Sequence, residues 1–95
     1  MIIKLFKQSG SFAENKDIAR DIRLKKIIPA LEKNQEVILD FINIDSATQS
    51  FIHALISDLI RKYGNKVLDK ISFKSCNNTI QKIINIVIDY MQTRE

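Results

Sequence analysis

The side chains best suited to chemistry gather in one stretch of the sequence, between residues 40 and 53. They are carboxylates, hydroxyls, an amide and the chain's single imidazole, at Asp40, Asp45, Ser46, Thr48, Gln49, Ser50 and His53. Nucleophilic catalysis needs a hydroxyl or thiol beside a base that a third group orients, and no Ser, Cys or acid near His53 in sequence forms such a pattern. We interpret His53 as a partly exposed helix residue, and Asp40 and Asp45 as hydrogen-bond acceptors at a strand end. The sequence therefore predicts a protein that is not an enzyme.

Other reactive and ligand-binding residues are sparse. With only Gly10 and Gly64, the chain has no glycine-rich phosphate loop. Its one cysteine, Cys76, cannot form an internal disulfide or a cysteine-rich metal site, and it fits a small, partly buried thiol in a reducing compartment. We therefore expect no cofactor, no metal and a cytoplasmic location. Apolar runs stay far short of the roughly 20 residues that cross a bilayer, so we expect no membrane partner.

The chain carries a net charge of +4, and the distribution of that charge decides whether nucleic acid is a partner. The densest basic segment contains Arg20, Arg23, Lys25 and Lys26. Steps of about 100° along a helix place these side chains at no common azimuth. Aromatic residues do not interleave with them, as stacking platforms for single strands would require. The pattern is typical of a solvated helix and does not favour nucleic-acid binding.

The elements that must position the stretch 40–53 are strands and helices in alternation. A chain of 95 residues builds a single hydrophobic core, so we predict one domain over residues 1–95. Apolar patterning predicts strands over 2–6, 36–41 and 71–74, with a short extended piece at 12–13. The run at 36–41 is nearly continuous, which is typical of a central strand buried on both faces.

Helices are expected in the three intervals between these strands and the chain end. The first begins at an Asn15 cap, and Pro29 is expected to kink or restart it near Ile28. The second has a complete apolar stripe, at Ile52, Leu55, Ile56, Leu59, Ile60 and Tyr63, and Gly64 ends it. The third follows a cap at Asn77 or Asn78. This order predicts a small α/β fold with three to four mostly parallel strands and about three helices, largely on one face of the sheet.

The region after the central strand resembles a known family. It reads Val37-Ile38-Leu39-Asp40-Phe41-Ile42-Asn43-Ile44-Asp45-Ser46-Ala47-Thr48-Gln49-Ser50-Phe51. A Leu-Asp-Phe strand followed by an aliphatic residue, and then by a Ser-Phe pair that opens a helix, is similar to a STAS-like family of unknown function related to bacterial anti-sigma-factor antagonists. The turn at 10–12 and the segment 73–79 also fit, so the resemblance covers nearly the whole chain. It implies a STAS-like fold and a regulatory role.

In the antagonists, the loop and helix start after the central strand dock an ATP-binding kinase or an anti-sigma factor. The resemblance implies a protein partner of that kind, with Asp45, Ser46, Thr48, Gln49, Ser50 and His53 as the contact surface. It also places Ser50 where the antagonists carry a phosphorylated hydroxyl, and a phosphate there would add about −1.5 to −2 charges beside a helix start.

Two departures argue against a phosphorylation switch at Ser50. Thr48 stands where the antagonists have Asp, and Phe51 stands where they have Gly; a large aromatic side chain would close the space that a kinase needs. The favoured interpretation of Ser50 is a helix cap or a first-turn hydroxyl. Ser46 and Gln49 also have capping-box spacing, so the sequence leaves more than one residue at which the helix can begin.

The sequence therefore predicts a non-enzymatic regulatory module that binds a protein partner through residues 43–53. A structural or self-associating subunit, forming a homodimer through a sheet edge, is the alternative, and a basic nucleic-acid-binding module is the third class.

Overall fold

The core of the fold is a three-stranded parallel sheet. A computed structural model describes residues 1–93. Its strands are β1 (Ile2–Lys4), β3 (Val37–Asp40) and β5 (Ile71–Lys74), in the order β1-β3-β5. The register aligns Ile3 with Leu39, and Leu39 with Phe73. The apolar run at 36–41 thus supplies the central strand, as its composition predicts.

A second, two-stranded parallel sheet lies beyond the ends of these strands. Its members are β2 (Phe12–Ala13) and β4 (Ser46–Ala47), with Phe12 paired to Ser46. The short extended piece at 12–13 is therefore confirmed, and β4 is an element that the sequence did not indicate. This small sheet joins the loop after β1 to the loop after β3, immediately before the helix start.

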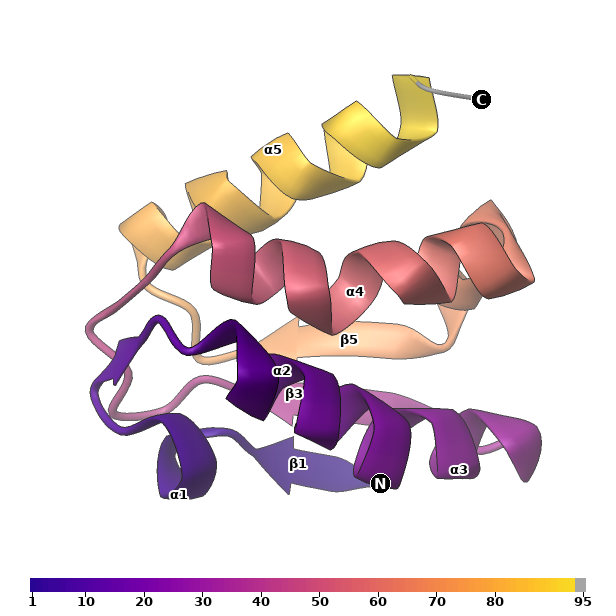
Figure 1. Cartoon of the computed structure of the whole chain (residues 1–95), viewed down its shortest axis with the longest axis horizontal. Helices are drawn as coiled ribbons and strands as arrows, with labels where there is room; N and C mark the ends of the chain where they lie inside the picture. The colour runs from indigo at the N-terminus through magenta and orange to yellow at the C-terminus, as the bar shows by residue number, and fades with distance from the viewer. Residues whose placement is uncertain (94–95) are drawn as a thin grey trace.

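The helices cover one face of the three-stranded sheet. In chain order they are α1 (Phe6–Ser9), α2 (Lys16–Ile22), the π-helical turn η1 (Arg23–Ile27), α3 (Ile28–Glu32), α4 (Gln49–Tyr63), the 3₁₀ turn η2 (Asn65–Asp69) and α5 (Asn78–Thr93). Helices α2 and α4 cross the sheet side by side, and α5 packs on the far side of α4 (Figure 1). The strands and helices form the α/β architecture expected of a small STAS-like domain.

Among residues 1–93, helices do not cover the opposite face of the sheet, and its side chains are largely exposed. Ile2 is 53% exposed, and Lys4, Ser72 and Lys74 are also exposed. Ile38 on the central strand is half-buried for the same reason. The expectation that 36–41 is buried on both faces is therefore wrong at Ile38, because helices cover only one side.

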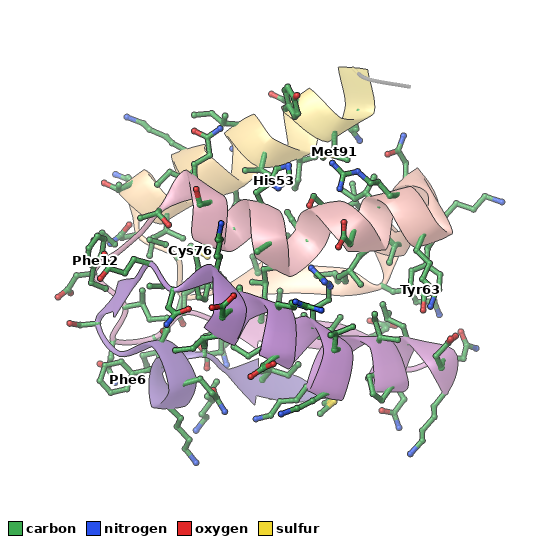
Figure 2. The ribbon with its side chains drawn as sticks, in the orientation of Figure 1. Phe6, Phe12, His53, Tyr63, Cys76 and Met91 are labelled. Atoms are coloured by element: carbon green, nitrogen blue, oxygen red, sulfur yellow. The ribbon has the colours of Figure 1, made fainter. Side chains whose placement is uncertain are left out.

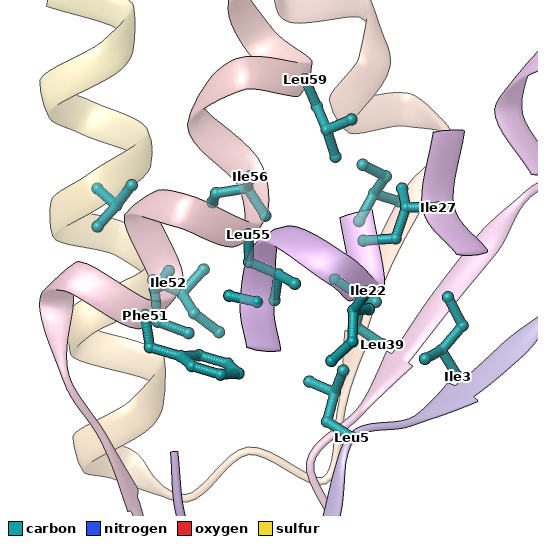
Figure 3. Close-up of a cluster of buried hydrophobic side chains, with 14 of the residues drawn as sticks. Ile3, Leu5, Ile22, Ile27, Leu39, Phe51, Ile52, Leu55, Ile56 and Leu59 are labelled. Carbon is teal, nitrogen blue, oxygen red and sulfur yellow. The ribbon is translucent and has the colours of Figure 1, made fainter. Parts of the chain in front are cut away.

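The hydrophobic core lies between the sheet and the helices, and α4 contributes most to it. The apolar stripe of α4 is buried from Ile52 to Ile60, as its i, i+3, i+4 spacing predicts, and Tyr63 at its end is partly buried. The stripe packs in one cluster with Ile3 and Leu39 from the strands, Leu5 directly after β1, and Ile22 and Ile27 from the first helix (Figure 3). Gly64 has a φ of +78° and its N–H donates to Ile60 O at 2.8 Å, so α4 ends where the glycine predicts.

The first strand is shorter than the predicted range 2–6. Leu5 takes a helical conformation, and α1 follows with Gly10 at its end, at a φ of +71°. Leu5 is fully buried, so the alternation of apolar residues continues although the strand has ended. A pattern of period two over five residues does not separate these two conformations.

The first long helix changes geometry just before its proline. Pro29 has no N–H to bond the carbonyl four residues earlier, and the Ile28 N–H donates to Arg23 O, five residues back. The turn η1 thus widens to π geometry, and α3 restarts at Ile28 with the proline in its first turn. The predicted kink or restart near Ile28 is confirmed as a restart, and the Arg23 side chain of η1 reaches α4.

Candidate functional site

The chain after β3 is held by hydrogen bonds before α4 begins. The Phe41 N–H donates to Lys74 O at 2.9 Å, and the Ile42 N–H donates to Asp40 Oδ1 at 3.0 Å. Asp40 is only 4% exposed, so this bond explains how a carboxylate is tolerated at the end of the central strand. The interpretation of Asp40 as a hydrogen-bond acceptor is confirmed.

Thr48 begins α4. Its Oγ1 accepts the Phe51 N–H at 3.1 Å and its backbone is extended, which is the geometry of a helix cap. Of the two alternatives for Ser50, a helix cap or a first-turn hydroxyl, the structure confirms the second, and the helix start that the spacing of Ser46 and Gln49 left undecided falls at Thr48. Ser46 belongs to β4, and Ser50 is an exposed residue of the first helical turn, as the second part of its interpretation expected.

Phe51 does not obstruct Ser50. The Phe51 side chain is fully buried and points into the core (Figure 3), whereas Ser50 faces solvent. The steric argument against a kinase reaching Ser50 is therefore wrong, because the two side chains leave the helix in different directions. The substitution of Thr48 for Asp remains a departure from the antagonists, and the structure gives it a role in the cap.

The structure brings three of the six predicted contact residues together in one groove. Asp45 and Ser46 lie at the small sheet: the Asp45 N–H donates to Ser11 O at 2.8 Å, and Asp45 O accepts from Asn77 Nδ2 at 2.7 Å. The Thr48 hydroxyl oxygen caps the start of α4 by accepting the Phe51 N–H. Only Gln49, Ser50 and His53 come together, on the side of α4 that faces α2 and α5.

These three residues line an open groove that we call the α4 groove. Its other lining residues are Lys16 from α2, Ala54 from α4, and Val87 and Tyr90 from α5, and its volume is about 580 Å³. Figure 2 places His53 between α4 and α5. Gln49 and Ser50 are exposed, and Tyr90 is 48% exposed. The α4 groove therefore offers an amide, a hydroxyl, an imidazole, an ammonium group and an aromatic ring over a small apolar floor.

The hydrogen bonds of Ser57 fix the orientation of the His53 ring. Ser57 Oγ lies 3.2 Å from His53 Nδ1 and also contacts the His53 carbonyl oxygen one turn back. Which of Ser57 Oγ and His53 Nδ1 donates depends on the tautomer of the ring, and in either case the Ser57 hydroxyl holds this side of the imidazole close to α4.

A buried arginine joins α4 to the first helix beside the α4 groove. Arg23 from η1 donates through Nη1 to Ala54 O and lies with Nη2 3.1 Å from Asp58 Oδ2. Asp58 Oδ1 also accepts from Arg61 Nη1 at 2.8 Å. We call these three side chains the arginine clasp. They line a second depression of about 410 Å³ that shares Lys16, His53 and Ala54 with the α4 groove.

The first helix gives this second depression a basic rim. Lys16 and Arg20 are exposed there, one turn apart, with Asp17 between them. The charges of Arg23 and Arg61 are engaged by Asp58. The rim therefore presents more positive than negative charge to a molecule that enters from solvent.

Cys76 lies partly buried after β5, as its sequence interpretation expects. Burial raises the pKa of the Cys76 thiol, and the nearby Asp40 carboxylate raises it further. Its Sγ lies 3.8 Å from Lys74 O. The thiol is therefore held in its protonated, poorly nucleophilic form.

The described residues offer neither a cluster of metal ligands nor a helix that could span a membrane. Over residues 1–93, His, Cys, Asp and Glu side chains do not gather in groups of three or more that could hold a metal ion. Within the same described range, the helices are too short or too polar to cross a membrane.

Sequence reasoning missed four residues of the α4 groove. Lys16, Ala54, Val87 and Tyr90 come from three helices, and only the tertiary packing brings them to Ser50. Two signals were present: Tyr90 lies outside the inner apolar stripe of its helix, and Lys16 directly follows the Asn15 cap. Parallel strands bring the starts of the helices that follow them to the same edge of the sheet, which places Lys16 near Ser50.

A parallel sheet covered by helices on one face, with a polar helix start after the central strand, defines a small STAS-like α/β module. The profile of one family, described as the STAS-like domain of unknown function (DUF4325), matches residues 19–81, which is more than half of the chain. The chain therefore belongs to this family, and the resemblance noted around Leu39-Asp40-Phe41 is confirmed. The turn at 10–12 and most of α5 lie outside the matched range. This family is not a known enzyme family. Comparisons with curated proteins and with solved structures found no match.

Proposed function

We propose that this chain is a non-enzymatic regulatory module that binds a protein partner through the α4 groove. One observation carries the proposal: Gln49, Ser50 and His53, which the sequence nominates, converge on an open groove with Lys16 and Tyr90. The fold uses none of these side chains in its core. A groove that combines an exposed aromatic ring with varied hydrogen-bonding groups has the composition of protein-binding surfaces.

The lining of the groove suggests which partner segment fits. Ala54 and Val87 form an apolar floor and Tyr90 one wall, which suit an apolar or aromatic side chain. Lys16, which lines both the groove and the second depression, and Arg20, on the rim of the second depression, suit an acidic residue beside it. The relationship to anti-sigma-factor antagonists supports an ATP-binding kinase or an anti-sigma-like protein as the source of that segment.

Ser50 can regulate such binding. Its hydroxyl is exposed in the first turn of α4, where the N-terminal dipole favours an anion. A phosphate would add about −1.5 to −2 charges at the mouth of the groove and would repel an acidic partner segment. Phosphorylation of Ser50 is thus a switch that the exposed position allows.

Site-specific crosslinking tests the proposal. A photoreactive amino acid replaces Gln49 in the groove, and a matched variant carries it at Lys66, an exposed residue of η2 at the other end of α4. After irradiation in the native cell, we expect a discrete protein adduct from position 49 and none from position 66. Mass spectrometry identifies the adduct and the phosphorylation state of Ser50. Equal adducts from both positions, or none from position 49, would contradict the proposal.

A further inference from the structure

Within the described part of the chain, the outer edge of β1 is not paired with another strand. β1 lies at the end of the sheet order β1-β3-β5 and is visible along the side of the sheet away from β5 (Figure 1). Toward β3, the Ile38 N–H donates to Met1 O at 2.8 Å and the Leu5 N–H donates to Asp40 O at 3.1 Å. In a parallel ladder alternate residues point their backbone groups to opposite sides, so the N–H and C=O groups of Ile2 and Lys4 point outward.

The Gln8 side chain already covers one of these outward groups. With its amide nitrogen turned to the strand, it donates to Lys4 O at 3.2 Å, and its oxygen then accepts from Lys26 Nζ at 2.8 Å. Ile2 C=O and Lys4 N–H remain at the edge. One residue of an added parallel strand, placed opposite Ile3, can form hydrogen bonds with both groups: its N–H donates to Ile2 O, and its C=O accepts from the Lys4 N–H.

A basic channel runs beside this edge. It has a volume of about 360 Å³, and its lining includes Lys4, Lys7 and Lys26 but no carboxylate. Asp21 lies on an adjoining depression, together with Lys25 and Lys26. Lys4 belongs to the open face of the sheet, whereas Lys26 comes from the helical face, so lysines flank both sides of an added strand.

We propose that the β1 edge binds an extended acidic segment of a partner protein as an added strand. The unpaired backbone groups supply the hydrogen bonds, Ile2 supplies apolar contact on the open face, and the three lysines select carboxylates at successive positions. Pairing of two copies through this edge is disfavoured, because it would bring the Lys4, Lys7 and Lys26 side chains of both copies together. This site lies at the sheet edge and is separate from the α4 groove.

A titration of the ¹⁵N-labelled protein tests the proposal. The probe is a pentapeptide with blocked ends, Glu-Glu-Val-Glu-Glu; the controls are its Lys-Lys-Val-Lys-Lys counterpart and a version with the central amide N-methylated. We expect the acidic peptide to shift the backbone amide signals of Ile2 and Lys4 and to slow hydrogen exchange of the Lys4 amide. Both controls should bind at least about fivefold more weakly, since one reverses the charge and the other removes a strand hydrogen bond.

Two lysine variants separate a built site from general basic charge. Lys26→Gln should weaken binding of the acidic peptide by about two- to fivefold, whereas Lys66→Gln, at an exposed lysine of η2, should leave the affinity for the peptide unchanged. The amide spectra of both variants check that they fold. Failure of the acidic peptide to bind, equal effects of the two variants, or signal changes at Ile71 and Phe73 on the other edge would overturn the proposal. Sedimentation that shows a dimer protecting the Lys4 amide without peptide would also overturn it.

Discussion

In the arginine clasp, we expect that loss of Asp58 destabilises the fold more than loss of Arg23. The Arg23 side chain is 10% exposed and the Asp58 side chain 50% exposed. Replacing Asp58 with Ala leaves a buried guanidinium with Ala54 O as its remaining partner. Replacing Arg23 with Met keeps most of the buried stem, and Asp58 retains Arg61 at 2.8 Å and solvent. The order of destabilisation therefore follows from which charge is left buried.

The magnitudes follow from burial. Breaking a fully buried pair from one side costs about 3–5 kcal/mol, and because Asp58 is half exposed we expect about 2–3 kcal/mol for Asp58→Ala. Replacement of a buried charge by an apolar side chain of similar volume is close to neutral, so Arg23→Met should cost roughly 0–1 kcal/mol. The Ala54 carbonyl lies inside α4 and keeps its helical hydrogen-bond position in that variant. The double variant should then be about 1–2 kcal/mol more stable than Asp58→Ala alone.

Urea unfolding followed by circular dichroism measures these differences. A domain of this size has a total unfolding free energy of roughly 5–14 kcal/mol, so the Asp58→Ala effect is readily resolved. Arg61→Met is the matched control: its pair is exposed on both sides, and we expect less than about 0.5 kcal/mol. If Asp58→Ala is no more destabilising than Arg23→Met, or if the double variant is the least stable, the reasoning from burial is refuted.

Four further outcomes follow from single residues. Thr48→Ala removes the cap of α4 and should lower the free energy of unfolding in urea by about 1 kcal/mol, whereas Ser50→Ala should change that free energy by less than about 0.5 kcal/mol. A larger loss for Ser50→Ala than for Thr48→Ala would disprove the assignment of the cap to Thr48. Ser50→Asp should raise the free energy of unfolding by about 0.3–1 kcal/mol at low salt, and this gain should disappear in 1 M salt if the helix dipole causes it. Asn77→Ala removes both the cap of α5 and the hydrogen bond to the loop after β3, so the free energy of unfolding should fall by about 1–2 kcal/mol in the same assay. A decrease no larger than that caused by a surface substitution would contradict this double role of Asn77. The alkylation rate of Cys76 should rise with pH, and the midpoint of this rise should lie at a higher pH in the folded chain than in urea, because burial and Asp40 raise the thiol pKa. Asp40→Asn should move the midpoint of the folded chain only part of the way back toward the value in urea. Identical pH profiles for the folded and unfolded chains would contradict a raised thiol pKa.

Much of the fold could be predicted because its signals are local. The apolar stripe and terminal glycine define α4, the alternation at 71–74 gives β5 with its observed bounds, and the continuous apolar run at 36–41 identifies the central strand. Each of these patterns lies within a single element and has a clear end. The π turn before Pro29 also follows from a local cause, the missing N–H.

The candidate site could be predicted only in part, because a groove is a property of packing. Gln49, Ser50 and His53 share one side of α4, but Asp45 and Ser46 are drawn to β2 by a pairing that no local pattern indicates. Phe51 misled the sequence reasoning because its side-chain direction was not considered. It stands one turn before Leu55 and therefore on the apolar side of α4.

Gln49 and His53 line the α4 groove, whereas Asp45 and Ser46 are not among its lining residues, and this difference allows a direct test of the groove. With the partner identified by crosslinking at position 49, its affinity is measured for two double variants, Gln49→Ala with His53→Ala and Asp45→Ala with Ser46→Ala. Binding through the groove predicts that the first pair weakens binding by about tenfold or more, which is roughly 1.4 kcal/mol, and that the second changes it by less than about twofold. A loss confined to the second pair would place the interface at the strand ends and contradict the central claim.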